Sequence, residues 1–271
     1  MAMQHATNRP NAFAEALKLR ERPIAVGAWC SLPGALNVEL IASAGFDWLG
    51  IDLQHGAIDT LMAVSMLQAA SISGTPTILR TASLDDAEIG RVLDAGAAGV
   101  IVPMINTADE ARALVEASRY PPQGRRSWGP TRPLMTVPGY SPETANRRTI
   151  CGVQIETAQA LGNLDEIFAV EGVDFAMVGP YDLAINLGIS PGPGIINAAH
   201  RDAIKSIADA CHRHGVVPAI YGPNARAAME FLPLGYTALT IVHDTALLSS
   251  FARKEAETGR AAIAALPKHS V

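Results

Sequence analysis

The strongest constraint on the fold is an alternation that repeats eight times along the chain. Short apolar runs alternate with longer stretches in which apolar residues recur every three or four positions, the patterns of buried strands and amphipathic helices. The predicted strands are Ile24–Cys30, Phe46–Leu53, Pro76–Thr81, Gly99–Met104, Cys151–Glu156, Val173–Gly179, Val216–Gly222 and Tyr236–Asp244. The predicted helices are Pro33–Ala44, Asp59–Ser71, Asp85–Ala95, Thr107–Arg119, Thr157–Val170, His200–His214, Asn224–Leu234 and Thr245–Ala265.

Eight such units predict a single α/β domain built as a (β/α)8 TIM barrel. Parallel strands that are buried on both faces, each followed by a helix, close into this barrel, which commonly takes about 250 residues. One barrel therefore accounts for residues 1–271, with residues 1–22 as an N-terminal extension. The alternative is a doubly wound open sheet, which most often carries a G-x-G-x-x-G turn after its first strand. The segment Gly27–Gly34 has no such turn, and this favours the barrel.

Composition limits the partners and the compartment. The 21 Lys and Arg against 26 Asp and Glu give a formal net charge of −5, which argues against general electrostatic binding to nucleic acid or to an anionic membrane and favours small-molecule chemistry. Cys30, Cys151 and Cys211 lack the spacing of a disulfide framework or a zinc site, so a reducing compartment is expected. The segment 1–23 lacks the apolar core of a secretory signal, and no apolar run approaches the ~20 residues of a membrane span. These features predict a soluble, cytoplasmic protein.

One connection is too long for a simple strand–helix barrel. The segment Tyr120–Arg148, between the fourth predicted helix and the fifth strand, is rich in Pro, Gly and Arg, which marks a functional loop or an oligomer arm. Its arginines face a single nearby acid, Glu143, and either bind an anionic substrate or form a subunit contact. They are Arg119, Arg125, Arg126, Arg132, Arg147 and Arg148. Another irregular segment, Ser190–Asn197, is predicted to be a loop ahead of the sixth crossover helix.

Polar residues gather where the predicted strands end, and in a TIM barrel the active site lies at these carboxyl ends. They are Asp52, Gln54, His55, Arg80, Gln154, Glu156, Tyr181, Asp182, His243 and Asp244. On the fifth strand the period of two places Gln154 and Glu156 on one face, and a carboxylate buried inside the barrel needs a compensating partner. A cation held by Glu156 and Asp182 provides one, because two carboxylates form a hard oxygen site that suits Mg²⁺ or Mn²⁺. The alternative is an ion pair with Arg or Lys that closes the barrel mouth.

Three further residues are candidates for catalysis, and each has a structural alternative. His55 is a candidate acid–base residue, although most histidines near strand ends are simply hydrogen-bonded. Arg80 places a fixed positive charge where it can bind a carboxylate or a developing enolate oxygen, and its alternative role is a salt bridge to Asp52. Asp94 stands at a helix end, where the helix dipole disfavours negative charge, so it is a candidate to orient a base. Its alternative is mere exposure to solvent.

Several short phrases also occur in a distinctive order and spacing. They are Gly45–Asp47, Asp52–His55, Leu93–Ala97, Val102–Met104, Arg119–Arg125, Gln154–Glu156 and Val178–Leu183. In this order they resemble the class II, metal-dependent pyruvate aldolases typified by 4-hydroxy-2-oxoheptanedioate aldolase, also called 2,4-dihydroxyhept-2-ene-1,7-dioate aldolase. The match runs from roughly Gly27 to Leu248. Any one phrase is weak, but the ordered set is highly specific.

The resemblance implies a barrel of the phosphoenolpyruvate/pyruvate type in which Glu156 and Asp182 hold a divalent metal, Mg²⁺ or Mn²⁺ and alternatively Co²⁺. Pyruvate would chelate this metal, with Arg80 beside its keto oxygen and Gln154 nearby. Backbone amides in the segment containing Gly179, Pro180 and Tyr181, where a short helix starts, would help to hold its carboxylate. His55 with Asp94 would form the proton-handling dyad.

The implied reaction is the cleavage or formation of a 4-hydroxy-2-oxo acid. A base involving His55 would take the 4-hydroxyl proton, the C3–C4 bond would break, and an aldehyde and pyruvate would leave by way of an enolate. No Schiff-base lysine is needed. The resemblance further implies a homohexamer, a trimer of dimers, whose last helix at Thr245–Ala265 swaps between neighbours, and a role in aromatic compound catabolism.

The sequence departs from the family pattern around the aldehyde half of the site. Gln54 stands where the family commonly has Glu, Arg126-Ser127-Trp128 interrupts a usual glycine-rich motif, Ala184 replaces Ser, and His243 occupies a usually apolar position. The natural aldehyde therefore stays open. Two alternatives to the aldolase remain: a related lyase or decarboxylase acting on oxaloacetate or an acyl-CoA, and a non-catalytic barrel that has kept the ligand site.

Overall fold

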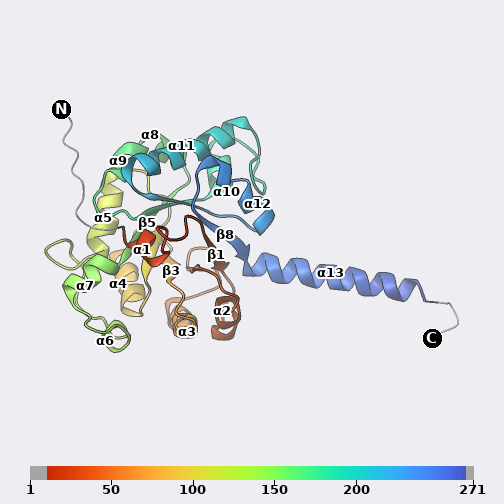
Figure 1. The fold of residues 1–271 in the computed structure, drawn as a ribbon, viewed down its shortest axis with the longest axis horizontal. Helices are drawn as coiled ribbons and strands as arrows, with labels where there is room; N and C mark the ends of the chain where they lie inside the picture. The colour runs from red at the N-terminus through yellow and green to blue at the C-terminus, as the bar shows by residue number, and fades with distance from the viewer. Residues whose placement is uncertain (1–10, 267–271) are drawn as a thin grey trace.

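Eight parallel strands form a closed barrel in the computed structural model, which describes residues 11–266 (Figure 1). The strands follow one another around the barrel in chain order, and β8 pairs with β1 to close it. They are β1 (Ala25–Cys30), β2 (Trp48–Asp52), β3 (Thr77–Arg80), β4 (Gly99–Val102), β5 (Ile150–Ile155), β6 (Phe175–Val178), β7 (Val217–Ile220) and β8 (Ala238–His243). The predicted TIM barrel is confirmed.

Helices alternate with the strands, as the sequence periodicity predicts. They are α2 (Ala35–Ala42), α3 (Thr60–Ala70), α4 (Asp86–Asp94), α5 (Ala108–Ser118), α8 (Ala158–Gly162), α9 (Leu164–Phe168), α11 (Ala198–His214), α12 (Ala225–Met229) and α13 (Asp244–Ala264). Side chains of Asp59, Asp85 and Thr107 cap α3, α4 and α5 by accepting a backbone hydrogen bond three residues ahead. The predicted helix Thr157–Val170 is divided into α8 and α9 at Asn163. The side chain of Asn163 donates a hydrogen bond to the Asn106 carbonyl.

Additional short helices lie outside this alternation. They are α1 (Ala12–Ala16), α6 (Pro133–Thr136), α7 (Pro142–Arg148) and α10 (Pro180–Asn186), with a 3₁₀ turn at Leu232–Leu234. Helix α1 lies in the predicted N-terminal extension, of which residues 1–10 are outside the described part. The predicted loop Ser190–Asn197 falls between α10 and α11 and contains neither helix nor strand.

The barrel interior is filled by aromatic rings that pack over glycines of neighbouring strands. A Cβ on Gly27 would stand 2.3 Å from the Trp48 ring, and one on Gly50 would stand 2.4 Å from Trp29. Helix α1 closes the amino-terminal end, where Phe13 stacks on Phe175 with ring centroids 4.2 Å apart. The barrel is therefore a packed core, and room for a ligand is left at its rims.

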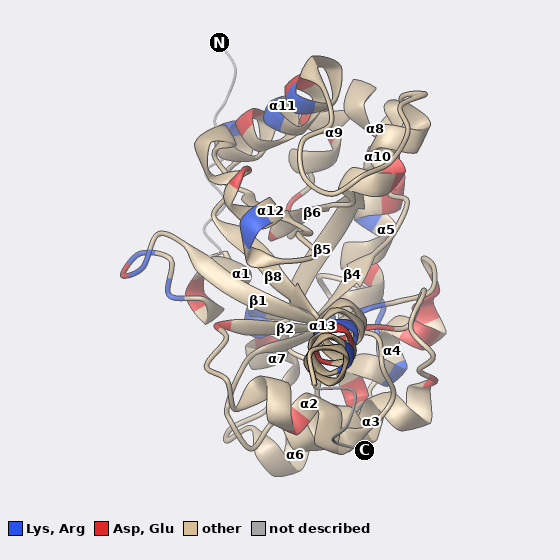
Figure 2. Ribbon diagram, turned by 90° about the vertical axis from the view of Figure 1, so that its right-hand side faces the viewer, with Lys and Arg blue, Asp and Glu red and all other residues tan. Residues whose placement is uncertain are grey.

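Helix α13 does not fold back onto the barrel. Figure 1 shows it extending away from the body, and Figure 2 looks along it. Leu247, Leu248 and Phe251 on this helix are 53%, 63% and 61% exposed. Its first residue, Asp244, is buried and accepts hydrogen bonds from the backbone N–H groups of Ser31 and Leu32 at the end of β1. The helix is thus anchored at its start and exposes apolar side chains beyond it.

Within residues 11–266, no helix is long and apolar enough to cross a membrane.

Candidate active site

The carboxyl ends of the strands surround a cavity of about 320 Å³ at the barrel mouth. Its polar and aromatic lining comes from all sides of the barrel. The residues include Trp29, Ser31, Asp52, His55, Arg80, Gln154, Gly179, Tyr181, Asp182, Tyr221, His243 and Thr245. Of the residues expected at the site, His55, Arg80, Gln154, Gly179, Pro180, Tyr181 and Asp182 line this cavity, and Glu156 hydrogen-bonds to the lining residue Gln154.

Glu156 follows the last residue of β5 and is only 2% exposed. Its carboxylate accepts hydrogen bonds from the Gln154 side chain and, at 3.0 Å, from the Met104 backbone N–H. Met104 has a φ of +57°, an uncommon conformation for this residue type that aims its N–H at the carboxylate. Gly179 leaves room for the group, because a Cβ there would lie 2.5 Å from Glu156 Oε2. The surrounding structure therefore fixes this carboxylate in one place.

The electrostatics of Glu156 call for a positive partner. Burial raises the pKa of Glu156 above its ordinary value, and the nearby charge of Asp182 also raises it, while the hydrogen bonds from Gln154 and Met104 act in the opposite direction. Asp182 lies in the first turn of α10 and is exposed. Among the described residues, neither carboxylate forms an ion pair, so the alternative of a salt bridge closing the mouth is not found.

Glu156 and Asp182 together fit a hard divalent cation. Both offer carboxylate oxygens, which Mg²⁺ and Mn²⁺ prefer. In the part of the chain that the structure describes, no group of three or more His, Cys, Asp or Glu side chains is arranged to hold a metal. A cation held by Glu156 and Asp182 therefore stays a prediction, and substrate or water would have to supply its remaining ligands.

Arg80 forms the salt bridge to Asp52 that the sequence offered as one of its two roles, and its binding of an anion stays a prediction. Its guanidinium pairs with Asp52 through Nε to Oδ1 at 2.9 Å and Nη2 to Oδ2 at 2.6 Å, and it lies over the Trp29 ring, 5.1 Å from the centroid. Burial alone would raise the pKa of Asp52, but the hydrogen bonds and charge of Arg80 outweigh it and lower this pKa. Nη1 faces Gln154 Oε1 at 3.4 Å. The salt bridge thus fixes the guanidinium so that Nη1 faces Gln154.

His55 lies at the exposed edge of the mouth. The turn that carries it is held by Asp52, whose Oδ1 accepts from the backbone N–H groups of Gln54 at 3.0 Å and His55 at 3.3 Å. The same carboxylate therefore positions both Arg80 and His55. The Gln54 side-chain oxygen is buried and, within residues 11–266, has no hydrogen-bond partner.

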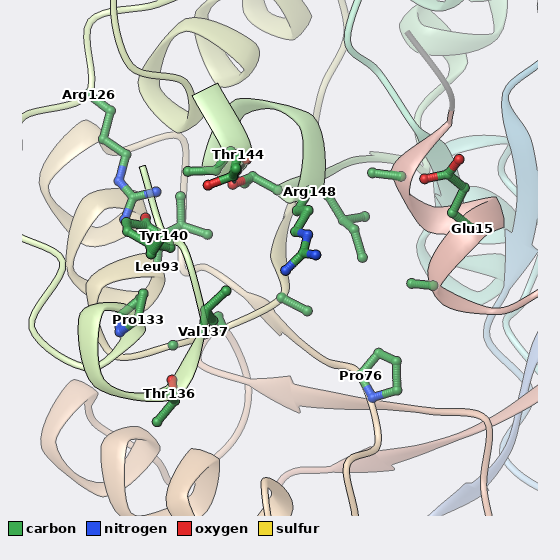
Figure 3. A pocket seen from close by; sticks show the side chains of 18 residues that line it. Glu15, Pro76, Leu93, Arg126, Pro133, Thr136, Val137, Tyr140, Thr144 and Arg148 are labelled. Atoms are coloured by element: carbon green, nitrogen blue, oxygen red, sulfur yellow. Dashed lines mark hydrogen bonds between the residues drawn. The ribbon is translucent and has the colours of Figure 1, made fainter. Parts of the chain in front are cut away.

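Asp94 is not brought to His55 within one chain. It is the last residue of α4, and a helix that follows a barrel strand ends at the opposite, amino-terminal end of the barrel. There its Oδ1 accepts from Arg126 Nη2 at 2.7 Å, which offsets the unfavourable helix dipole and leaves Asp94 partly exposed. Figure 3 shows this end, where Arg126 and Leu93 line a separate cavity of about 490 Å³ beside α6 and α7.

Arg126 and Arg148 of the arginine-rich segment line this amino-terminal cavity, and none of the segment's arginines lines the mouth of its own chain. Arg125 pairs with Asp86 and Glu116, and Arg126 with Asp94. Arg119 is buried and donates to the Thr149 carbonyl at 2.5 Å. Carboxylates and carbonyls distant along the chain thus neutralise much of the positive field expected from the local sequence. Because Arg126 and Arg148 also line the amino-terminal cavity, both alternatives, an anionic ligand and a subunit contact, stay predictions.

Trp29, Ser31, Tyr221 and Thr245 line the mouth but were not among the candidates from sequence. Tyr221 immediately follows the last residue of β7, so the strand-end rule that identified His55 also applies to it. Ser31 immediately follows β1 in the same way. Trp29 lies within a strand and carries no comparable sequence signal.

Comparison with known proteins now adds a family. Residues 26–250 match the family described as HpcH/HpaI aldolase/citrate lyase. The chain belongs to the HpcH/HpaI aldolase/citrate lyase family. This membership confirms the resemblance and the expectation of an aldolase-type lyase.

Individual relatives of the family match most of the chain. A hydroxypyruvate/pyruvate aldolase of Rhizorhabdus wittichii is 37% identical over 88% of this chain and 94% of its own. A 4-hydroxy-2-oxo-heptane-1,7-dioate aldolase of Klebsiella pneumoniae is 38% identical over 88% of this chain and 90% of its own. The crystal structure of a family member from Burkholderia cenocepacia superposes with a TM-score of 0.83 at 29% identity, over 93% of this chain and all of that one.

Proposed function

We propose that this protein is a metal-dependent aldolase that cleaves or forms 4-hydroxy-2-oxo acids, with pyruvate and an aldehyde as the other partners of the reaction. The observation that carries the proposal is the buried Glu156 carboxylate beside Asp182, at a mouth that also holds Arg80 and Gln154. The names of the relatives agree with this chemistry. The expected role in aromatic compound catabolism depends on the natural substrate and stays a prediction.

Glu156 and Asp182 would hold the divalent cation, Mg²⁺ or Mn²⁺ and alternatively Co²⁺. Such a cation, when bound, supplies Lewis-acid polarisation of the keto and carboxylate oxygens of pyruvate. Gln154 spans the two charged partners of the site, because its Nε2 donates to Glu156 and its Oε1 accepts from Arg80. We therefore assign Gln154 as the residue that orients Arg80 and Glu156 relative to each other.

The start of α10 would help to hold the pyruvate carboxylate. Gly179 N–H donates to the Ile155 carbonyl and Pro180 has no N–H, so these two residues contribute shape only. Tyr181 and Asp182 are in the first turn of α10, where backbone N–H groups have no partner within the helix. Their N–H groups are therefore the donors available to an anion.

In the cleavage direction, His55 accepts the proton of the 4-hydroxyl group. The C3–C4 bond then breaks, the aldehyde leaves, and the bond's electron pair collects as the pyruvate enolate, whose oxygen the Arg80 guanidinium stabilises. Return of a proton to the methylene carbon gives pyruvate. Asp94 can assist His55 only from a second copy of the chain, because the two residues lie at opposite ends of one barrel.

We also propose that α13 docks on a second copy, within the homohexamer that the family resemblance implies. The apolar side chains of Leu247, Leu248 and Phe251 are exposed on α13, and Leu36 and Leu40 are 67% and 64% exposed on α2. In a ring of eight strand–helix units, the helix after β8 would pack beside α2. An α13 exchanged between two copies of the chain would cover the exposed apolar side chains of both α13 and α2. Light scattering during size-exclusion chromatography tests this. A chain truncated after residue 245 should form an assembly of fewer subunits than the full chain does.

The exchange of pyruvate methyl protons with D₂O, followed by NMR, tests the proposed chemistry without any aldehyde. We expect exchange that requires Mg²⁺ or Mn²⁺ and is lost on chelation and in Glu156→Gln. Glu143→Gln, an equivalent change on the exposed first turn of α7, should exchange normally. Cation-dependent exchange that survives Glu156→Gln would remove Glu156 from the site. Binding of pyruvate without exchange in the wild-type protein would favour the non-catalytic barrel.

A further inference from the structure

The mouth has two halves of different chemistry. Residues on or just after β3, β5 and β6 form the half of the mouth that the proposed function assigns to pyruvate. The other half is an aromatic and polar wall from β7, β8 and β1. In this wall the Tyr221 ring packs edge-on against Trp29 and His243, at centroid distances of 6.2 Å and 5.8 Å. With pyruvate in the first half, as the proposed function assigns, this wall is the part of the mouth left to contact the aldehyde.

A hydrogen-bond chain runs through the wall to the pyruvate half. Tyr221 Oη lies 2.7 Å from His243 Nδ1, and His243 Nε2 lies 3.0 Å from Ser31 Oγ. Ser31 Oγ in turn lies 3.4 Å from Asp52 Oδ2, and Asp52 holds Arg80. Four strands therefore contribute successive groups to a single connected chain.

The direction of this chain follows from its acidic end. An ionised carboxylate accepts only, so the Ser31 hydroxyl donates to Asp52, and Ser31 Oγ then accepts from His243 Nε2–H, which also faces Thr245 Oγ1 at 3.2 Å. The Asp244 carboxylate, 3.7 Å from Nε2, also favours the proton on that nitrogen. Burial lowers the pKa of His243 below its ordinary value, against the opposing charges of Asp244 and Asp52, so the ring is neutral near pH 7. Nδ1 is then unprotonated, and it accepts the Tyr221 hydroxyl proton.

In this arrangement the Tyr221 hydroxyl donates its proton to His243, so toward the cavity its oxygen can only accept a hydrogen bond. We propose that Tyr221, held by His243, selects short aldehydes that carry a hydroxyl group beside the carbonyl, by accepting a hydrogen bond from that hydroxyl. His243 acts as a positioning residue, because it fixes the Tyr221 hydroxyl in the accepting orientation. The inference rests on the proposed aldolase function and adds the class of acceptor.

Charge at the wall agrees with a neutral, hydroxylated acceptor. Among residues 11–266, Arg80 is the one Lys or Arg that lines the mouth, and its charge is paired with Asp52. An acidic aldehyde would therefore find no unpaired arginine or lysine from its own chain, whereas a hydroxyl group finds an oriented acceptor. A site built to receive a hydroxyl discriminates against the analogue that lacks it, since the buried polar group is then left unpaired.

The experiment compares glycolaldehyde with propanal, which replaces the hydroxyl by a methyl group of similar size, as acceptors for pyruvate in the metal-loaded enzyme. We expect a higher kcat/KM for glycolaldehyde. Tyr221→Phe should lower that kcat/KM about three- to tenfold, the value of one hydrogen bond, and change propanal less than twofold. His243→Val should lower the ratio of kcat/KM for glycolaldehyde to that for propanal to a similar extent. The double variant Tyr221→Phe/His243→Val should show nearly the same ratio as His243→Val alone. Tyr140→Phe, whose hydroxyl faces Tyr120 at the amino-terminal end, is the matched control.

Proton exchange into pyruvate separates this inference from the proposed function. The exchange rate of each variant is measured alongside its acceptor rates, and the control Tyr140→Phe should keep exchange within twofold of wild type. An equal loss for both aldehydes would overturn the inference, because it would mean that Tyr221 contacts the carbonyl group common to both. An unchanged preference alongside normal exchange would also overturn it while leaving the aldolase intact. Absence of exchange in the wild-type enzyme would instead refute the proposed function.

Discussion

Asp52 provides the sharpest test of how the mouth is held together. Its Oδ1 accepts from Arg80 Nε and from the backbone of Gln54 and His55, while its Oδ2 accepts from Arg80 Nη2, the Trp29 ring nitrogen and the Ser31 hydroxyl. Asp52→Asn keeps the oxygen at the Oδ1 position. At the Oδ2 position it places an amide NH₂ against three other donors, and it removes the charge.

The magnitude follows from burial, since the side chains of Arg80 and Asp52 are only 10% and 2% exposed. Breaking a buried ion pair by neutralising one partner costs about 3–5 kcal/mol of unfolding free energy. Because Arg80 then loses its fixed orientation, we also expect kcat/KM to fall about 100-fold, the effect typical of a 1 Å displacement of a catalytic group.

Urea unfolding at fixed protein concentration and the rate of pyruvate release from a 4-hydroxy-2-oxo acid measure the two effects. Asp209→Asn, at an exposed α11 residue paired with Lys205, is the matched control and should change neither by much. If Asp52→Asn unfolds within 1 kcal/mol of wild type and turns over within about threefold of it, the proposed support of Arg80 by Asp52 is wrong.

Two further predictions concern the carboxylates. The pKa of Asp52 is lowered in the folded state, so its stabilising effect is complete above the ordinary pKa of 3.8 and is lost as pH falls through the lower folded value. The gap in unfolding free energy between wild type and Asp52→Asn should therefore shrink with falling pH only below about 4, and a gap that shrinks between pH 7 and 5 would contradict this. Gly179→Ala would place a Cβ 2.5 Å from Glu156 Oε2, so it should weaken Mn²⁺ binding at least tenfold in a titration while circular dichroism shows the fold unchanged. Gly162→Ala, where a Cβ meets nothing within 4 Å, should bind Mn²⁺ normally.

The barrel could be predicted from sequence because each strand–helix unit carries its own periodic signal, and eight of them allow few other arrangements. The same regularity located Arg80, Gln154, Glu156 and Asp182, since a strand end fixes a residue at the mouth. Asp94 instead ends a helix, and the helices that follow barrel strands end at the opposite rim.

Contacts between distant segments were beyond prediction. Nothing local in the sequence indicates that Arg126 meets Asp94, or that Ser31 lies between His243 and Asp52. Such pairs depend on the closure of the barrel between β8 and β1 and on the path of a long connection. Helix α1 was also missed, because contacts with distant segments stabilise so short a helix: Phe13 packs on the barrel floor, and the Ala12 N–H donates to Asp174.

The residues at the start of α13 both line the mouth and anchor the helix to the barrel. His243 and Thr245 line the mouth, and between them Asp244 ties the helix to the end of β1. A partner that binds the outer part of α13 therefore also restrains His243 and Thr245 in the part of the mouth assigned to the aldehyde. If α13 docks on a second copy, turnover per chain should decline on dilution and return on concentration, so that the enzyme's own abundance sets how active each molecule is.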